Sequence, residues 1–368
     1  MVEDCKLQFR VYRFLTSGSR FANGLLEWVE LLELFLLNGG VMIHTRICDL
    51  LGIIHPVILG GMGTATTAPL VAAVSNAGGF GTLGTSAFNA ATLDTEVASI
   101  RERTEKPFGI NHLLFQVQED MFAVTLRTQP AVAAFAWARK DQNLRDYFQR
   151  AHDAGCKVMY SAGEVPEALR AAQAGADVLV AQGTEAGGHV GWMASLPLVP
   201  MMVKAVAPLP VLSAGGIADG RGLAAALALG AEGVLLGTRF MATPEAPIHA
   251  NFKQAIVKSD GHDTVLTEIP DLASQRVWPG AMSRAQRNQF IERWAGREWT
   301  LRQNATEVGK QVLAARAAGD VNNASLSFGQ DAGLIDSIKS VKEVVQDIVK
   351  EAEEIIRDRL PSLLRESR

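Results

Sequence analysis

From residue 55 onward, short apolar runs alternate with alanine-rich stretches, and this rhythm limits the possible folds more than any other feature. The runs predict buried strands at 56–59, 80–83, 108–111, 131–135, 157–160, 177–180, 210–213 and 233–236. Helical segments such as 68–75, 167–173 and 222–229 lie between them. Strands that alternate with helices form βαβ units and a parallel sheet. Repetition of one pattern favours closure into a (β/α)8 TIM barrel over an open, doubly wound sheet.

Several predicted helices end in Ala-Gly or Leu-Gly just before the next strand. The glycines concerned are Gly78, Gly155, Gly175 and Gly230. A glycine directly after a helix adopts the left-handed conformation that closes the helix. These pairs therefore mark the boundaries of the repeating units.

The rhythm stops near residue 258, where the composition becomes more polar. Residues 42–257 are predicted to form the barrel and residues 258–324 a smaller, mostly helical insertion that covers it. Residues 325–368 are expected to return to the barrel and to end in an outer helix, because apolar residues recur at helical spacing there. The expected fold class is thus α/β, with an insertion near the C-terminus.

Residues 1–41 are predicted to be an N-terminal appendage outside the fold. Glu27, Glu30 and Glu33 interrupt their apolar stretch at every third position, which is typical of a short amphipathic helix. A signal peptide needs an uninterrupted apolar region, and a bilayer span needs about 20 mostly apolar residues. An organellar targeting peptide is a weaker alternative, because Glu3 and Asp4 add acidic charge.

Composition and charge limit the classes of partner that the protein could bind. Hydrophobic residues make up 48% of the 368 residues, enough for a large core, and the formal net charge is −4. That charge offers no basic field for nucleic acid or for a membrane surface. The three cysteines, Cys5, Cys48 and Cys156, form neither a metal-binding spacing nor a disulfide framework. We therefore expect a cytoplasmic protein without a metal. The composition leaves open whether the protein forms an oligomer.

Glycine-rich or polar loops follow the predicted strands at the end where TIM barrels carry their chemistry. These loops are 60–63, Asn111, 182–192 ("QGTEAGGHVGW"), 214–217 and 237–240. The loops after the seventh and eighth strands are the usual phosphate site of such barrels, and Asp219 is a plausible cap for the helix after the seventh. The alternative is that the glycines only make tight turns. We favour the phosphate site because both loops are glycine-rich.

His189 lies in the loop 182–192 and is the candidate for chemistry. Its ordinary pKa of about 6.5 suits proton transfer or an electrophilic hydrogen bond near neutral pH. Glu185 is either an acid near His189, a solvated charge or an acceptor for backbone N–H groups. Trp192 either walls the pocket or packs elsewhere. Of Asn111 and His112, strand alternation lets only one face the barrel interior.

Covalent acyl transfer is not expected. The sequence has no G-x-S-x-G elbow, and Cys156 immediately precedes the predicted fifth strand, at the end away from the loops that carry chemistry.

Together, the ordered motifs look like those of the nitronate monooxygenases, formerly called 2-nitropropane dioxygenases, which are FMN enzymes on a TIM barrel. The motifs are "GGMG", "SNAGGFGTLG", "PFGIN", "VAQGTEAGGHVG", "SAGGIADGRG", "LGTRF" and "GQDAGLI". The resemblance covers about residues 42–257 and returns at 325–336.

The resemblance implies that FMN is the common ligand of the glycine loops. The residues expected to bind it are Gly61, Met62, Asn111, Gln182, Gly187, Gly215, Gly216, Leu236, Gly237, Thr238 and Gln330. Those at 215, 216 and 236–238 would hold the phosphate, and His189 would lie beside the reactive face of the flavin as the catalytic residue.

The implied reaction is oxidation of an alkyl nitronate by O2 to a carbonyl compound and nitrite. His189 could bind the nitronate anion or accept the α-proton of a neutral nitroalkane. Segment 324–333 lacks the tyrosines that line the substrate pocket in one branch of the family, so the substrate is less well defined than the flavin site.

Two rival functions remain. The flavin-dependent enoyl-acyl-carrier-protein reductases share "AGGH", "AGGIADG" and "GTRF" and would use NAD(P)H. A barrel that binds flavin without turnover is the other. The inosine-monophosphate dehydrogenase class is rejected because its loop cysteine is missing.

Overall fold

A computed structural model describes residues 42–365. From His44 onward these residues belong to one compact unit. The predicted appendage at 1–41 lies outside the described residues, as do the last three residues of the chain.

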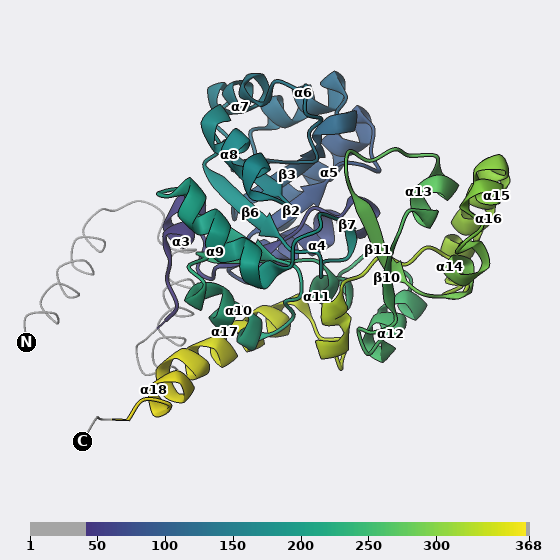
Figure 1. Ribbon diagram of the computed structural model, residues 1–368. Helices are drawn as coiled ribbons and strands as arrows, with labels where there is room; N and C mark the ends of the chain where they lie inside the picture. Colours follow the sequence, from purple (N-terminus) through teal and green to yellow (C-terminus); the bar gives the residue numbers. More distant parts are fainter. Residues whose placement is uncertain (1–41, 366–368) are drawn as a thin grey trace, which may run out of the picture. The chain divides into compact units, whose positions relative to one another are not determined.

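The core is a closed parallel barrel (Figure 1). Its strands follow the order β1-β9-β8-β6-β5-β4-β3-β2, and a parallel bridge between Ile58 and Phe80 joins the two ends. The TIM barrel is confirmed, because each predicted strand is present. The bounds are β1 (Val57–Leu59), β2 (Gly81–Gly84), β3 (Phe108–Leu113), β4 (Val132–Ala136), β5 (Lys157–Ala162), β6 (Val178–Gln182), β8 (Val211–Ala214) and β9 (Gly233–Leu236).

The outer helices connect successive strands of the barrel along the chain. They are α4 (Ala68–Asn76), α5 (Ala90–Arg103), α6 (Glu119–Thr128), α7 (Leu144–Asp153), α8 (Val165–Ala174), α9 (Ser195–Val206) and α10 (Gly220–Ala228). The four glycines predicted to close helices all have positive φ, from 85° to 108°. A residue with a Cβ would be strained at such an angle, which explains the recurring Ala-Gly and Leu-Gly pairs.

Alternate residues of the strands point into the barrel and form an apolar core. This cluster includes Val132, Ala134, Val178, Val180, Leu212 and Ala214. Ile47, Cys48 and Leu51 of α3 (Arg46–Leu51) pack against the same cluster. Helix α3 therefore plugs the barrel interior from one end.

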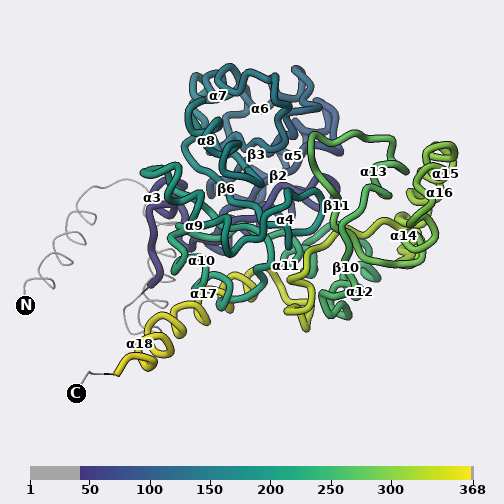
Figure 2. The backbone as a smooth tube through the Cα atoms, in the orientation of Figure 1, coloured from purple at the N-terminus to yellow at the C-terminus, as the bar shows by residue number. Residues whose placement is uncertain are grey.

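The segment 258–324 contains strands as well as helices. Its elements are β10 (Thr264–Thr267), α13 (Ile269–Ser274), β11 (Met282–Gln286), α14 (Gln289–Trp294), α15 (Glu298–Gln303) and α16 (Ala305–Ala318). They share a separate apolar cluster that includes Ile269, Phe290 and Leu301. Figure 2 shows this segment as a lobe beside the barrel. The strands were not predicted, because they lie in a polar segment outside the repeated apolar runs of the barrel.

A short strand of the barrel loops joins this lobe. Strand β7 (Gly188–Val190) pairs with β11, which also pairs with β10, and both pairings are antiparallel. The loop predicted at 182–192 is therefore partly a strand at the edge of the inserted segment.

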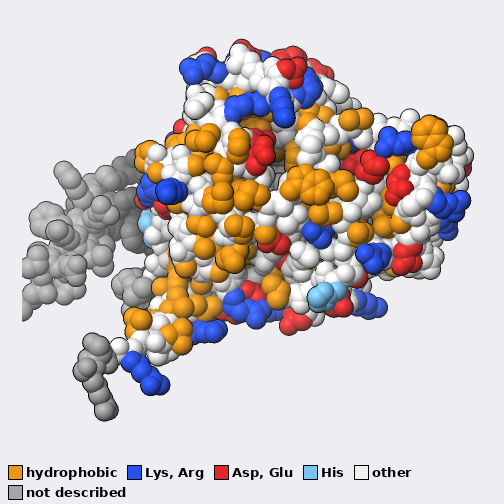
Figure 3. Space-filling view, in the orientation of Figure 1, with side chains coloured by type: hydrophobic (Ala, Val, Ile, Leu, Met, Phe, Trp, Pro, Cys, Tyr) orange, Lys and Arg blue, Asp and Glu red, His pale blue; other side chains and the backbone are white. Residues whose placement is uncertain are grey.

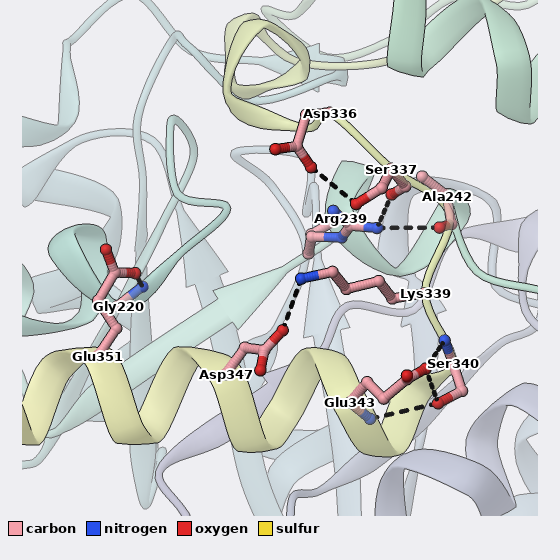
Figure 4. A network of polar contacts seen from close by, with 10 residues as sticks. All are labelled: Gly220, Arg239, Ala242, Asp336, Ser337, Lys339, Ser340, Glu343, Asp347 and Glu351. Carbon is pink, nitrogen blue, oxygen red and sulfur yellow. Dashed lines mark hydrogen bonds and ion pairs between the residues drawn. The ribbon is translucent and has the colours of Figure 1, made fainter.

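The chain returns to the barrel through η3 (Gln330–Leu334) and α17 (Val341–Glu354), as Figure 4 shows in part. Ser340 and Glu343 form a capping box at the start of α17. Glu351 accepts a hydrogen bond from the backbone N–H of Gly220 at 2.7 Å. Arg239 donates to the carbonyl oxygens of Ala242 and Ser337. These contacts fasten α17 to α10, and the segment before α17 to the segment after β9.

Basic and acidic side chains are interspersed on the face drawn in Figure 3. Across residues 42–365, no helix is both long and apolar enough to span a bilayer.

Gly220→Ala should lower the free energy of unfolding by about 1–3 kcal/mol, the usual cost of overpacking. A Cβ at Gly220 would lie 2.5 Å from the Ile348 carbonyl oxygen and 2.5 Å from the Ala352 nitrogen. Denaturant unfolding would measure the loss. Gly296→Asn is the control, because Gly296 has φ +73° and open space around it, and asparagine tolerates that conformation. Equal stability of Gly220→Ala and wild type would contradict tight packing of α17 on α10.

Candidate active site

A cavity of about 510 Å³ opens at the carboxyl ends of the barrel strands. Interior residues such as Ala134, Met159 and Ala214 form its floor and also belong to the core that α3 plugs. The cavity therefore lies at the opposite end of the barrel from α3, where TIM barrels carry their chemistry.

Most of the predicted site residues line this cavity. They are Gly61, Met62, Asn111, Gln182, Gly187, His189, Gly215, Leu236, Gly237 and Thr238. Gly216 and Gln330 do not line it. Gln330 is exposed, whereas its neighbours Phe328 and Asp331 reach the cavity.

The glycines of the 182–192 loop permit close backbone packing. A Cβ on Gly187 would lie 2.5 Å from the Cα of Phe328, and one on Gly183 would meet Ser195. Gly191 packs in the same way against the backbone of Gly163. Several glycines in one loop are thus needed because three other segments approach it closely, and Gly187 also lines the cavity.

One part of the cavity offers unused backbone donors. No acceptor for the backbone N–H groups of Gly215 and Gly237 is found among residues 42–365. Thr238 begins the short helix α11 (Thr238–Met241), so its N–H group has no partner within that helix. Converging N–H groups of this kind suit an anion such as phosphate. Asp219 caps α10 by accepting from the N–H of Gly222, as predicted.

Asp331 lies beside these donors. It is 5% exposed, and burial raises the pKa of its carboxyl to about 7 although a hydrogen bond with Thr238 opposes the shift. Near neutral pH the carboxyl is therefore protonated in a substantial fraction of molecules, which reduces its repulsion of a nearby anion.

His189 projects into another part of the cavity from β7. Its Nε2 atom lies 2.8 Å from Oδ1 of Asp271 in α13, and both side chains are largely buried. Its ring stacks on Trp278, with 3.3 Å between ring centroids and 12° between planes. Trp278 in turn contacts Phe115 and Trp137.

The sequence did not indicate Asp271 or Trp278 as partners of His189. Asp271 is 82 residues from His189 along the chain, and no spacing motif connects them. Trp278 lies in a polar segment, and no motif connects it with His189. Pairing of β7 with β11 brings the inserted segment to His189, and this pairing has no sequence signal.

The remaining alternatives are decided by geometry. Glu185 accepts hydrogen bonds from the N–H and Oγ of Ser195, so it braces the loop through backbone and hydroxyl donors. His112 is buried between Thr85 and Thr125, and burial lowers its pKa to about 4, whereas Asn111 lines the cavity. Trp192 is 70% exposed and does not line it.

Comparison with known proteins agrees with this architecture. The family model described as nitronate monooxygenase matches residues 44–351. The chain belongs to the nitronate monooxygenase family. It is therefore an oxidoreductase of that type, and membership supports dependence on a flavin.

Individual relatives carry several names. A probable nitronate monooxygenase of Staphylococcus saprophyticus is 30% identical, over 85% of this chain and 99% of that protein. A Mycobacterium tuberculosis protein named (3aS,4S,5R,7aS)-5-hydroxy-7a-methyl-1-oxo-octahydro-1H-indene-4-carboxyl-CoA dehydrogenase is 34% identical, over 84% of this chain and 96% of that protein.

The solved structures that resemble this chain also have different named activities. FabK from Thermotoga maritima is 37% identical with a TM-score of 0.79, covering 88% of this chain and all of that one. Nitroalkane oxidase from Streptomyces ansochromogenes is 26% identical with a TM-score of 0.74, covering 86% and 99%. Relatives of similar likeness thus have different named activities, so the family leaves the substrate open.

Asp331→Asn should stabilise the protein more at pH 8 than at pH 5. The folded-state pKa of about 7 exceeds the ordinary value of 3.8, so the folded protein binds the proton more tightly than the unfolded chain does. Asp331 therefore reduces stability as the pH rises from about 4 through 7, and the amide removes this dependence. Thermal unfolding at both pH values would measure it. Asp141→Asn, at an exposed position, should show no such difference. An equal effect of Asp331→Asn at both pH values would contradict the raised pKa.

Proposed function

We propose that the protein is an FMN-dependent enzyme that oxidises alkyl nitronates with O2 to a carbonyl compound and nitrite. The observation that carries the proposal is the cavity itself. It combines unused backbone donors from Gly215 and Gly237 with a buried His189–Asp271 pair, within a member of the nitronate monooxygenase family.

The residues present fit FMN. Backbone N–H groups of Gly215, Gly237 and Thr238 would hold its phosphate. Gly61 lines the cavity, and a Cβ there would lie 2.5 Å from the Cβ of Asn111, so glycine lets Asn111 pack closely. Glycine at this position also adds no side chain to the space that a flat ring would occupy. The Asn111 amide would hydrogen-bond the edge of that ring. FMN, when bound, supplies the redox chemistry.

Gln182, Gly187, Leu236 and Met62 line the same cavity and would contact the cofactor. The predicted contribution of Gly216 and Gln330 would be indirect, because neither lines the cavity. Gln330 donates from its backbone N–H to the carbonyl oxygen of Glu185, which keeps the return segment against the 182–192 loop.

The positive charge that lines the cavity favours an anionic substrate. Arg276 and Arg316 line the cavity, and no carboxylate pairs with either guanidinium among residues 42–365. Arg316 donates to Thr64 and to the carbonyl oxygen of Ser325. His189 would bind the nitronate oxygens as a hydrogen-bond donor when its imidazole is protonated, or accept the α-proton of a neutral nitroalkane when the imidazole is neutral. Trp137 and Trp278 would exclude water from the space beside His189.

Reduction of an enoyl thioester by NAD(P)H is the second candidate. Two observations favour it: the likeness to FabK at 37% identity and the likeness to a dehydrogenase of a CoA-linked compound at 34% identity. The absence of tyrosine from 324–333 is consistent with either substrate.

Anaerobic addition of propyl-2-nitronate to the purified yellow protein should bleach its visible absorption, and air should then restore the colour and release nitrite. His189→Ala should retain the cofactor but lower turnover by about 100-fold or more, the scale of a lost acid–base group. His262→Ala is the control, because His262 is exposed and does not line the cavity.

Other outcomes of this experiment point elsewhere. A yellow protein that ignores nitronate and is bleached by NADH or NADPH would support the enoyl reductase. A protein that responds to neither would support a flavin-binding barrel without turnover. Unchanged turnover in folded His189→Ala would remove His189 from the reaction.

Gly237→Leu should weaken FMN binding by about tenfold or more, equivalent to about 1.4 kcal/mol. The new side chain would begin 3.1 Å from the sulfur of Met62 and would occupy the space beside the phosphate donors. Fluorescence titration with FMN measures the dissociation constant. Gly280→Asn is the matched control, because Gly280 has φ +73° and no neighbour within 4 Å. Full FMN content in Gly237→Leu would count against this phosphate site.

A further inference from the structure

We propose that Asp271 is a positioning residue that sets the orientation and the tautomer of the His189 imidazole. The proposal deepens the proposed function, because it assumes that His189 acts on the substrate. It assigns to the inserted segment a direct part in preparing the site.

The carboxylate of Asp271 is directed at His189 alone. Its Oδ1 atom lies 2.8 Å from Nε2, and the side chains are 12% and 17% exposed. Within residues 42–365, no other group donates a hydrogen bond to this carboxylate and no lysine or arginine pairs with it. The backbone N–H and carbonyl oxygen of Asp271 bond to Glu268 and Arg276 instead. The side chain is therefore not needed to cap or close α13.

The inserted segment constrains His189 in two further ways. The backbone of His189 pairs with that of Ser283 in β11, and the face of the His189 ring lies on Trp278. Arg284 of β11 also donates to the carbonyl oxygen of Thr184, in the loop that leads to β7. The inserted segment from β10 to β11 therefore fixes the backbone position of His189, the plane of its ring and the hydrogen bond of its Nε2 atom.

This geometry determines which nitrogen is available to the substrate. An ionised carboxylate can only accept, so the neutral imidazole carries its proton on Nε2 and keeps a lone pair on Nδ1. No group within residues 42–365 bonds to Nδ1, and the side chain lines the cavity. When Nδ1 gains a proton, Asp271 stabilises the imidazolium, as the buried aspartate does in a serine-protease triad.

A purely structural role is the alternative. In that case Asp271 would only fasten the insertion to the barrel, and any hydrogen-bond partner would serve. Asp271→Asn separates the two roles, because the amide keeps the shape of the side chain but loses the charge and can donate to Nε2. Nε2 would then accept a hydrogen bond, and the neutral imidazole would carry its proton on Nδ1.

The experiment uses the full chain labelled with ¹⁵N-histidine, as purified with its cofactor. Nitrogen chemical shifts at a pH where the rings are neutral distinguish the two tautomers, and loss of signals in His189→Ala identifies those of His189. Glu292→Gln is the matched control: it makes the same carboxylate-to-amide change at an exposed position of the same insertion. Turnover of 2-nitropropane, a neutral nitroalkane whose α-proton the Nδ1 lone pair would accept, is measured on the same samples.

We expect wild type and Glu292→Gln to show the Nε2–H form. Asp271→Asn should shift His189 toward the Nδ1–H form and lower kcat by about 10²–10⁴-fold with little change in KM. An unchanged tautomer in folded Asp271→Asn would overturn the proposal. So would a shifted tautomer with kcat unchanged while His189→Ala is inactive.

The tautomer measurement needs no substrate, so it separates two failures. Full turnover in His189→Ala would remove His189 from the reaction, whereas a wild-type protein that turns over neither 2-nitropropane nor propyl-2-nitronate would refute the proposed function. The nitrogen shifts would still decide whether Asp271 sets the form of the imidazole.

Discussion

Pairing between β7 and β11 is the interaction on which the candidate active site depends. Three residues of a barrel loop become the edge of a small antiparallel sheet whose other strands belong to the insertion. Without that pairing, His189 would lie on a glycine-rich loop with few constraints on its backbone. With it, Asp271 and Trp278 reach the imidazole from a segment more than 80 residues away along the chain. The insertion is therefore part of the site, not only a cover.

Close backbone packing completes the arrangement. The return segment crosses the 182–192 loop at Gly187, and its Gly329 N–H donates to Oγ1 of Thr238 at 2.9 Å. One short segment thus touches both the loop that carries His189 and the loop that offers phosphate donors. Glycines are required where these backbones meet, which is a structural reason for their number that does not depend on a ligand.

The barrel was predictable because its signal is local and repeated. Each strand is a short apolar run, and each of four helices ends at a glycine with positive φ. The loops at one end followed from the topology of parallel strands, so most predicted site residues could be placed in one cavity. Strands β10 and β11 were not predictable, since they lie outside the repeating pattern and β11 pairs with the distant strand β7.

The sequence by itself determined the fold class, the end of the barrel that carries the site and the family resemblance. These depend on periodicity and on motifs that are contiguous in the chain. Only the tertiary structure decided which side chains accompany His189, which of Asn111 and His112 faces the cavity, and that Asp331 rather than Gln330 reaches it. The physical reason is that long-range strand pairing and burial set these relations, and neither leaves a pattern in neighbouring residues.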